Sequence, residues 1–209
     1  MTMKLTTTTN VTVDGVMQGL GGPEEDPSGG FERGGWAIPY FDGEAASLVG
    51  DVYQRADAFL FGRRTYEIFA ASWPLIPTDD DPISAALNGR PKHVASRTLG
   101  SVGWSGARLI EGDVAEAVRA LRAEDGGELQ VHGSPGLVQT LLREDLVDEL
   151  RLVVAPVTLG RGKRLFEEGT VPRTWRPTAS TVTSTGVLGT SYRRAGEVRT
   201  GSMGPEYTG

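Results

Sequence analysis

The 209-residue sequence contains no cysteine. This absence excludes a disulfide framework, a thiolate nucleophile and a thiolate-ligated zinc ion. Only two histidines, His93 and His132, remain as neutral-pH bases or soft metal ligands, which disfavours a zinc site and a Ser–His hydrolase. We therefore expect no bound metal, and the lack of cysteine is consistent with a cytoplasmic location.

Long apolar runs are absent as well. No stretch approaches the roughly 18 uninterrupted apolar residues of a membrane-spanning helix, and the N-terminal MTMKLTTTTN lacks the apolar core of a signal peptide. The formal net charge of −6 repels polyanions. We expect neither a membrane nor a nucleic acid as partner, so any phosphate group must be held by a local cluster of donors.

The composition is that of an ordinary folded protein, with 38% hydrophobic and 23% charged residues and 29 glycines. We predict a single domain over residues 1–195, followed by a loosely held tail over 196–209 that has almost no apolar content. The segment 19–35 is dense in glycine, proline and acidic residues, as is typical of a lid over an active site.

Apolar periodicity predicts alternating strands and helices. Strands are expected at Met3–Thr9, Ala58–Phe61, Pro91–Ser96, Arg108–Ile110, Glu128–His132 and Leu150–Ala155, and helices at Glu44–Ala56, Val114–Glu124 and Pro135–Arg143. This alternation indicates an α/β fold with a mostly parallel sheet. After Pro156, segments 180–184 and 189–194 alternate around a turn and predict an antiparallel C-terminal hairpin, which makes the sheet mixed.

Two strand ends carry groups suited to phosphate. The strand Ala58–Phe61 runs into Gly62-Arg63-Arg64-Thr65 and a new helix, so free N–H groups, a hydroxyl and guanidinium forks are expected together. A second strand ends in Ser96-Arg97-Thr98. Since ligands of open α/β sheets gather at the carboxyl ends of strands, the two ends are expected to converge. The alternative is a pair of ordinary turns with surface arginines.

The third strand end is His132-Gly133-Ser134-Pro135-Gly136-Leu137, in which Ser134 suits an N-cap and Pro135 the first helical turn. The following N–H groups would be free for a pyrophosphate, although simple capping explains the motif as well. It is not the G-x-G-x-x-G fingerprint of a Rossmann domain. The Gly162-Lys163 pair does not make a P-loop, because Val157 and Arg164 occupy two of its required positions.

Taken in order, these segments resemble the dihydrofolate-reductase-like family, and within it the reductase domain of riboflavin biosynthesis (the RibD C-terminal domain) in its small stand-alone form. The matching segments are 13–15, 58–66, 73–74, 87–99, 129–142, 146–150 and 156–166. The resemblance implies a dihydrofolate-reductase-like three-layer fold with about eight strands and NADPH as cofactor. No cysteine or spare length is left for the zinc deaminase domain that such reductases often carry.

The resemblance also implies positions for the cofactor. It places Asn10, Val11 and Met17 beside the nicotinamide, and the glycine-rich segment from Gly19 as the lid. Near the adenosine phosphate and the pyrophosphate it implies Gly62, Arg63, Arg64, Thr65, Ser96, Arg97, Thr98, His132, Gly133, Ser134, Gly136 and Leu137.

A proton donor is the remaining requirement. Folate reductases carry a carboxylate on the first helix, but the count back from Gly62 falls on Ala46, which leaves Asp42, Glu44 and Asp51 as nearby candidates. The sequence thus predicts an NADPH-dependent reductase, akin to dihydrofolate reductase or the 5-amino-6-(5-phosphoribosylamino)uracil reductase. Its substrate would be a small pterin-like or ribosylaminopyrimidine-like heterocycle. The alternatives are a noncatalytic nucleotide-binding protein and an interaction module, and a homodimer is the default assembly.

Overall fold

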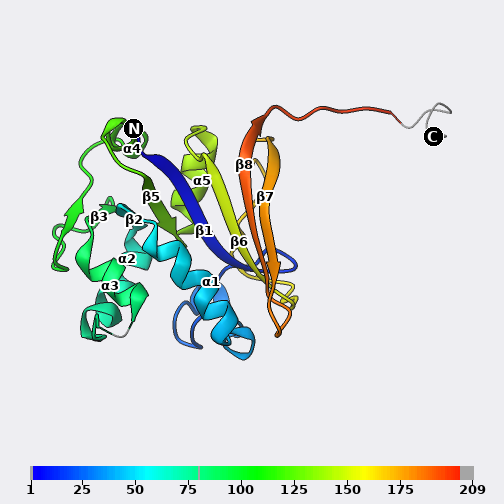
Figure 1. Ribbon diagram of the computed structural model, residues 1–209, viewed down its shortest axis with the longest axis horizontal. Coiled ribbons are helices and arrows are strands. Elements are labelled where there is room, and N and C mark those ends of the chain that lie inside the picture. The colour runs from blue at the N-terminus through cyan, green and yellow to red at the C-terminus, as the bar shows by residue number, and fades with distance from the viewer. Residues whose placement is uncertain (1, 80, 203–209) are drawn as a thin grey trace.

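The computed structural model describes residues 2–79 and 81–202 (Figure 1). Its strands are β1 (Lys4–Thr12), β2 (Ala58–Gly62), β3 (Lys92–Ala95), β4 (Ala107–Leu109), β5 (Glu128–His132), β6 (Glu149–Ala155), β7 (Thr174–Val182) and β8 (Leu188–Gly196). Its α-helices are α1 (Gly43–Gln54), α2 (Arg63–Ser72), α3 (Pro82–Gly89), α4 (Val114–Ala123) and α5 (Pro135–Arg143). Short 3₁₀ turns lie at Ser28–Gly30, Ile38–Tyr40 and Trp73–Leu75.

The strands form one sheet of eight in the order β4-β3-β2-β5-β1-β6-β8-β7. The pairs from β4 through to β6 are parallel, whereas β8 runs antiparallel to both β6 and β7. The expected mixed sheet with an antiparallel C-terminal hairpin is therefore confirmed. Because β1, β2, β3 and β5 run parallel, their carboxyl ends lie at one edge of the sheet.

Helices cover both faces of the sheet, and β2 shows why (Figure 1). Its apolar run alternates, so that Phe59 and Phe61 pack with Val49 of α1, whereas Leu60 packs with Leu141 of α5. All four residues from Ala58 to Phe61 are buried. A strand that is covered on both faces needs apolar side chains at every position, and this explains the unbroken apolar run of β2.

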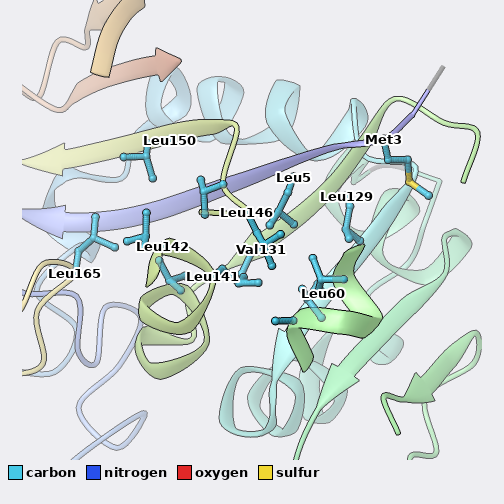
Figure 2. Close-up of a cluster of buried hydrophobic side chains, with 14 of the residues drawn as sticks. Met3, Leu5, Leu60, Leu129, Val131, Leu141, Leu142, Leu146, Leu150 and Leu165 are labelled. Carbon is cyan, nitrogen blue, oxygen red and sulfur yellow. The ribbon is translucent and has the colours of Figure 1, made fainter. Parts of the chain in front are cut away.

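The larger core cluster lies between the sheet and the helices α4 and α5. Figure 2 shows part of this cluster: Leu5 of β1, Leu129 and Val131 of β5 and Leu150 of β6 lie along the sheet, and Leu141 belongs to α5. Leu5, Leu129, Val131 and Leu141 have no exposed surface. Each such side chain contributes about 1.5–3 kcal/mol when fully buried, so this cluster fixes the height of α5 above β2 and β5.

The structure departs most from the predicted elements in three places. Strand β1 continues past Thr9 to Thr12, because Asn10–Thr12 pair with Val153–Ala155 of β6. Helix α3 was not predicted, although Asp81 caps it by accepting hydrogen bonds from the amides of Ile83 and Ser84. Strand β7 begins at Thr174 rather than near residue 180, and it tolerates Pro177 because it is an edge strand of the sheet.

The predicted tail falls partly outside the described residues. Gly196 ends β8, residues 197–202 are exposed and belong to no helix or strand, and residues 203–209 lie outside the described part of the chain. The division into a domain over 1–195 and a tail stays a prediction. Within residues 2–79 and 81–202, no helix combines the length and the apolar character needed to cross a bilayer.

Candidate functional site

A cavity of about 960 Å³ opens where the carboxyl ends of the parallel strands meet. We call it the central cavity. Its lining joins the ends of β1, β2, β3 and β5 to the starts of α2 and α5 and to the loop before α1. Ligands of open α/β sheets bind at this edge, and the volume is that of a site for a large organic ligand.

Two of the strand ends are locked together by Ser134. The amide of Gly62 donates to Ser134 Oγ at 2.8 Å, and Ser134 Oγ in turn donates to Thr65 Oγ1 at 2.7 Å. A Cβ atom on Gly62 would lie 2.9 Å from Ser134 Oγ, so this approach requires a glycine. The turn after β5 therefore sits directly on the start of α2.

The helices α2 and α5 both begin at the central cavity without a side-chain cap. Before α5, Gly133 and Ser134 adopt left-handed backbone conformations with φ of 58° and 61°. A left-handed residue other than glycine is uncommon and costs conformational energy. Since the first N–H groups of a helix have no partner within it, two sets of free donors and two positive dipole ends meet in one cavity.

Arginines surround these helix starts. Arg63 Nη1 donates to Thr98 Oγ1 at 2.8 Å, which ties the start of α2 to the turn after β3. Arg64 forms an ion pair of 3.1 Å with Asp26. Arg97 is exposed, and no ion pair involves it within the described residues. We call residues 62–65, 96–97 and 133–137 the basic rim of the central cavity.

The glycine-rich segment 19–35 forms one wall of the cavity. Gln18 Nε2 donates to the carbonyl oxygens of Asp26 and Ser28, each at 2.9 Å. Asp26 accepts a hydrogen bond from Lys163 Nζ at 2.5 Å. Burial alone would raise the pKa of Asp26, but the hydrogen bonds from Lys163 and Ser28 and the charge of Lys163 outweigh it, so the pKa lies below its ordinary value. Asp26 is thus a carboxylate that links the loop to Arg64 and Lys163.

Beneath α1, polar side chains of the sheet form what we call the cavity floor: Thr8, Asn10 and His132. The His132 ring stacks on Tyr53 of α1, with ring centres 4.0 Å apart. Burial, with a smaller effect of the nearby Arg151 charge, lowers the pKa of His132 to about 3. The imidazole is therefore neutral at physiological pH, and the floor carries no charge from this residue.

The structure brings together nearly all of the predicted cofactor residues. Those that line the central cavity are Asn10, Met17, Gly62, Arg63, Arg64, Thr65, Ser96, Arg97, His132, Gly133, Ser134, Gly136 and Leu137. Val11 does not line it, because its side chain is packed in the core cluster beside α5. Thr98 also stands outside the lining and reaches the site only through its contact with Arg63.

The three predicted proton donors lie elsewhere. Asp42 caps α1 by accepting from the amide of Ala45 at 2.9 Å, and it also accepts from Ser184 Oγ at 2.8 Å. Glu44 accepts from the amide of Ser184 at 2.6 Å, and Asp51 is exposed. None of the three lines the cavity, where the carboxylates among the described residues are Glu25, Asp26 and Asp113. Acids at a helix start stabilise free N–H groups, and this explains Asp42 and Glu44 without catalysis.

Several lining residues were not predicted from the sequence. The sequence offers Lys163 only as part of a failed P-loop, and it marks Val49 and Tyr53 only as members of the expected helix Glu44–Ala56. Spacing along one element shows which side faces the sheet, but not that part of this side overhangs a cavity. Asp113 follows the end of β4 and caps α4. A capping residue between a strand and a helix is the same pattern that predicted Ser134, so Asp113 could have been predicted from the sequence. Across the described residues, no group of three or more His, Asp or Glu side chains is placed to hold a metal ion.

Comparison with known proteins gives a family match over most of the chain. The sequence model of the family described as the RibD C-terminal domain matches residues 3–188. Protein YyaP of Bacillus subtilis (strain 168) is 28% identical over 165 residues, which are 75% of this chain and 76% of YyaP. Protein YwjB of the same organism is 32% identical over 128 residues, which are 61% of this chain and 68% of YwjB.

Solved structures share the fold at low sequence identity. A protein described as a riboflavin biosynthesis protein from Shewanella sp. PV-4 has a TM-score of 0.67 at 22% identity, over 92% of this chain and 99% of its own. A pyrimidine reductase-like protein from Corynebacterium diphtheriae has a TM-score of 0.61 at 14% identity, over 92% of each chain. Dihydrofolate reductase from Enterococcus faecalis, complexed with NADP(H) and RAB-propyl, has a TM-score of 0.57 at 16% identity, over 91% of this chain and 96% of its own. The expected dihydrofolate-reductase-like fold is confirmed.

Proposed function

The chain belongs to the RibD C-terminal domain family and has a reductase-type fold, and on this premise we propose that it is an NADPH-dependent reductase of a small heterocyclic substrate. The observation that carries the proposal is the basic rim. Two helix starts without side-chain caps and three arginines surround one cavity of a protein with a net charge of −6. Such a cluster suits a polyanionic dinucleotide.

The rim fits the phosphates of NADPH in two parts. The amides at the start of α5, around Gly136 and Leu137, would hold the pyrophosphate, because the left-handed turn before them leaves these donors free. Arg63 and Arg97 would hold the 2′-phosphate, since a guanidinium binds a phosphate monoester through two parallel hydrogen bonds. The guanidinium of Arg64 is paired with Asp26, so Arg64 would bind a phosphate only if the phosphate displaced that carboxylate.

Asn10, which belongs to the floor, and Met17 would lie beside the nicotinamide. The bound cofactor supplies the hydride, and the residues of the chain position the substrate against it. The loop segment 19–35 would exclude water, and Gly19, Leu20 and Asp26 already stand in the cavity wall. A movement of this loop stays a prediction, as do a homodimer and a cytoplasmic location.

A noncatalytic nucleotide-binding protein of the same fold is the second candidate function. It is favoured by one observation: Asp42, Glu44 and Asp51 stand outside the cavity lining. Both candidate functions would use the basic rim to bind the nucleotide, and they differ only in whether the protein reduces a substrate. Oxidation of NADPH with dihydrofolate or a ribosylaminopyrimidine as acceptor, followed by the loss of nicotinamide absorbance, would therefore separate them.

The basic rim is tested by the cofactor preference of two arginine variants. Arg97→Ala should reduce the preference for NADPH over NADH by about tenfold, since it removes a charged hydrogen-bonding partner worth about 1.5–3 kcal/mol. Arg108→Ala is the matched control, because Arg108 is exposed on β4 and does not line the cavity. Binding is measured by nicotinamide fluorescence. An unchanged preference in Arg97→Ala would remove this residue from the phosphate site, and an absence of NADPH binding in the wild-type protein would overturn the proposal.

A further inference from the structure

The glycine-rich segment 19–35 is joined to the basic rim by one ion pair, which we call the loop–rim pair. Arg64 Nη2 of the rim lies 3.1 Å from Asp26 Oδ1 of the segment. Within the described residues, no other hydrogen bond or ion pair connects the segment to the rim. Both side chains line the central cavity, so a ligand bound there would meet the pair.

The base of the segment is anchored by other contacts. The amide of Gly35 donates to the carbonyl oxygen of Gly19 at 2.8 Å and closes the base. Phe31 and the adjoining Trp36 are buried in a third core cluster with Val16. None of these residues belongs to the basic rim, so this anchorage would remain if the loop–rim pair were broken.

Asp26 has partners enough without Arg64. Its carboxylate accepts hydrogen bonds from Lys163 Nζ at 2.5 Å, from Ser28 Oγ at 2.6 Å and from the Ser28 amide at 3.3 Å. The Asp26 side chain is only 10% exposed, and a carboxylate at such a place is costly when it has no cation beside it. Because Lys163 would stay as that cation, Asp26 can lose Arg64 without becoming an unpaired buried charge.

Arg64 is held less firmly than Asp26. Its side chain is 51% exposed, and its guanidinium makes the ion pair but no hydrogen bond within the described residues. Ion pairs with an exposed partner contribute little to stability. A phosphate would bind the planar guanidinium through two parallel hydrogen bonds, and at the start of α2 it would also face free helix amides. A phosphate would therefore bind Arg64 more strongly than Asp26 does.

We propose that Asp26 is an autoinhibitory group, which occupies Arg64 in the free protein and is displaced from it by a phosphate of the bound dinucleotide. Cofactor binding then releases segment 19–35 from the basic rim while the base of the segment stays anchored. The inference rests on the proposed function, because that function supplies the phosphate. Since linkage is reciprocal, the loop–rim pair must weaken NADPH binding by the same factor by which NADPH weakens the pair.

Asp26→Asn removes the competing charge while keeping the size of the side chain. It should bind NADPH about fivefold more tightly than the wild-type protein, the factor that corresponds to a partly exposed ion pair. Glu25→Gln is the matched control, because Glu25 also lines the central cavity and loses the same charge but pairs with no arginine within the described residues. Nicotinamide fluorescence measures both affinities. A gain in Asp26→Asn no larger than that in Glu25→Gln would overturn the inference.

A double-mutant cycle with Arg64→Ala separates competition for the guanidinium from direct repulsion of the cofactor. In the Arg64→Ala background, Asp26→Asn should change NADPH affinity no more than Glu25→Gln does, because no guanidinium is left to compete for. If the whole gain of Asp26→Asn persisted without Arg64, Asp26 would repel the cofactor directly, and the inference would be wrong.

Amide hydrogen exchange of residues 21–30 needs no variant of Asp26, so it decides the inference even if Asp26→Asn fails to fold. Saturating NADPH should speed exchange in this stretch of the wild-type protein by up to about fivefold, the factor that the pair contributes. Arg64→Ala should do the same without NADPH. Unchanged or slower exchange on NADPH binding would contradict the inference, because the segment would then stay on the rim.

The NADPH titration of the wild-type protein keeps this inference apart from the proposed function. If NADPH binds and Asp26→Asn gains nothing over its control, the inference falls and the proposed function stands. If NADPH does not bind, the proposed function falls, and the same variants are titrated with inorganic pyrophosphate by calorimetry. Tighter pyrophosphate binding in Asp26→Asn than in Glu25→Gln then supports competition at Arg64, and equal binding overturns it.

Discussion

The basic rim and the cavity floor are two regions of one cavity that use different kinds of groups. The rim consists of exposed or half-exposed arginines and free helix amides, and it lies where strands end and helices begin. The floor consists of the neutral side chains of Thr8, Asn10 and His132, of which His132 is held by Gln130, and Gln130 in turn donates to Glu128. Charge at the rim attracts an anionic ligand over a distance, whereas the floor presents only neutral side chains to the cavity.

Arg151 of β6 forms ion pairs with Glu128 and Glu149 beside the floor, and breaking this cluster should have the largest effect on stability. Arg151→Met leaves the largely buried Glu128 and Glu149 without their nearest cation, since Arg55 lies 3.8 Å from Glu128, and we expect a loss of about 3–5 kcal/mol in the free energy of unfolding. Arg119→Ala is the control, because the side chains of the pair Arg119–Glu144 are 50% and 44% exposed and such pairs contribute at most about 1 kcal/mol. Urea denaturation measures both. If Arg151→Met and Arg119→Ala lost similarly small amounts of the free energy of unfolding, the floor would not depend on this cluster.

The neutral imidazole of the floor predicts a dependence of stability on pH. Because the pKa of His132 in the folded protein is lowered to about 3, the unfolded chain binds a proton at mildly acidic pH and the folded protein does not. Stability should therefore fall as the pH is lowered from 7 to 5, by about 2 kcal/mol for an unfolded pKa near 6.5.

Two histidine variants assign this pH dependence. His132→Gln should flatten the profile between pH 7 and pH 5, whatever its effect on stability at pH 7. His93 is half-buried and its pKa is lowered chiefly by burial, so it acts in the same direction. His93→Gln should therefore leave most of the slope in place. A profile that stays steep in His132→Gln would mean that the imidazole is not held neutral by the fold.

At the rim, the close approach of Gly62 to Ser134 predicts a smaller loss of stability. In Gly62→Ala the new Cβ would lie 2.9 Å from Ser134 Oγ and 3.0 Å from Ser134 Cβ, and relieving such overpacking costs about 1–3 kcal/mol. NADPH affinity should fall as well, because the turn before α5 must shift. Gly89→Ala is the control, since nothing lies within 4 Å of the added atom. Equal thermal midpoints and NADPH affinities in the two variants would refute the contact.

The rim could be predicted from local signals in the sequence, whereas the floor was predicted only in part: Asn10 and His132 were expected from the family resemblance, and Thr8 was not. Each segment of the rim carries its own local signal, a strand followed by glycine and a helix start, and parallel strands bring such ends to one edge. Thr8 has no local signal, because it is an ordinary strand residue whose place at the cavity depends on its register partner, His132. The carboxylates near the start of α1 were predicted but do not line the cavity. Their chemistry suits a proton donor, yet in the structure they stabilise the start of the helix.

The central claim is that the free amides at the starts of α2 and α5 bind the phosphates of NADPH. Backbone amide NMR of the full chain during an NADPH titration tests it most directly, since each amide reports on its own hydrogen bond. We predict that the largest shift changes fall on residues 63–65 and 136–137. Saturable binding that leaves these amides unmoved and shifts those of another surface, such as β7 and β8, would contradict the account.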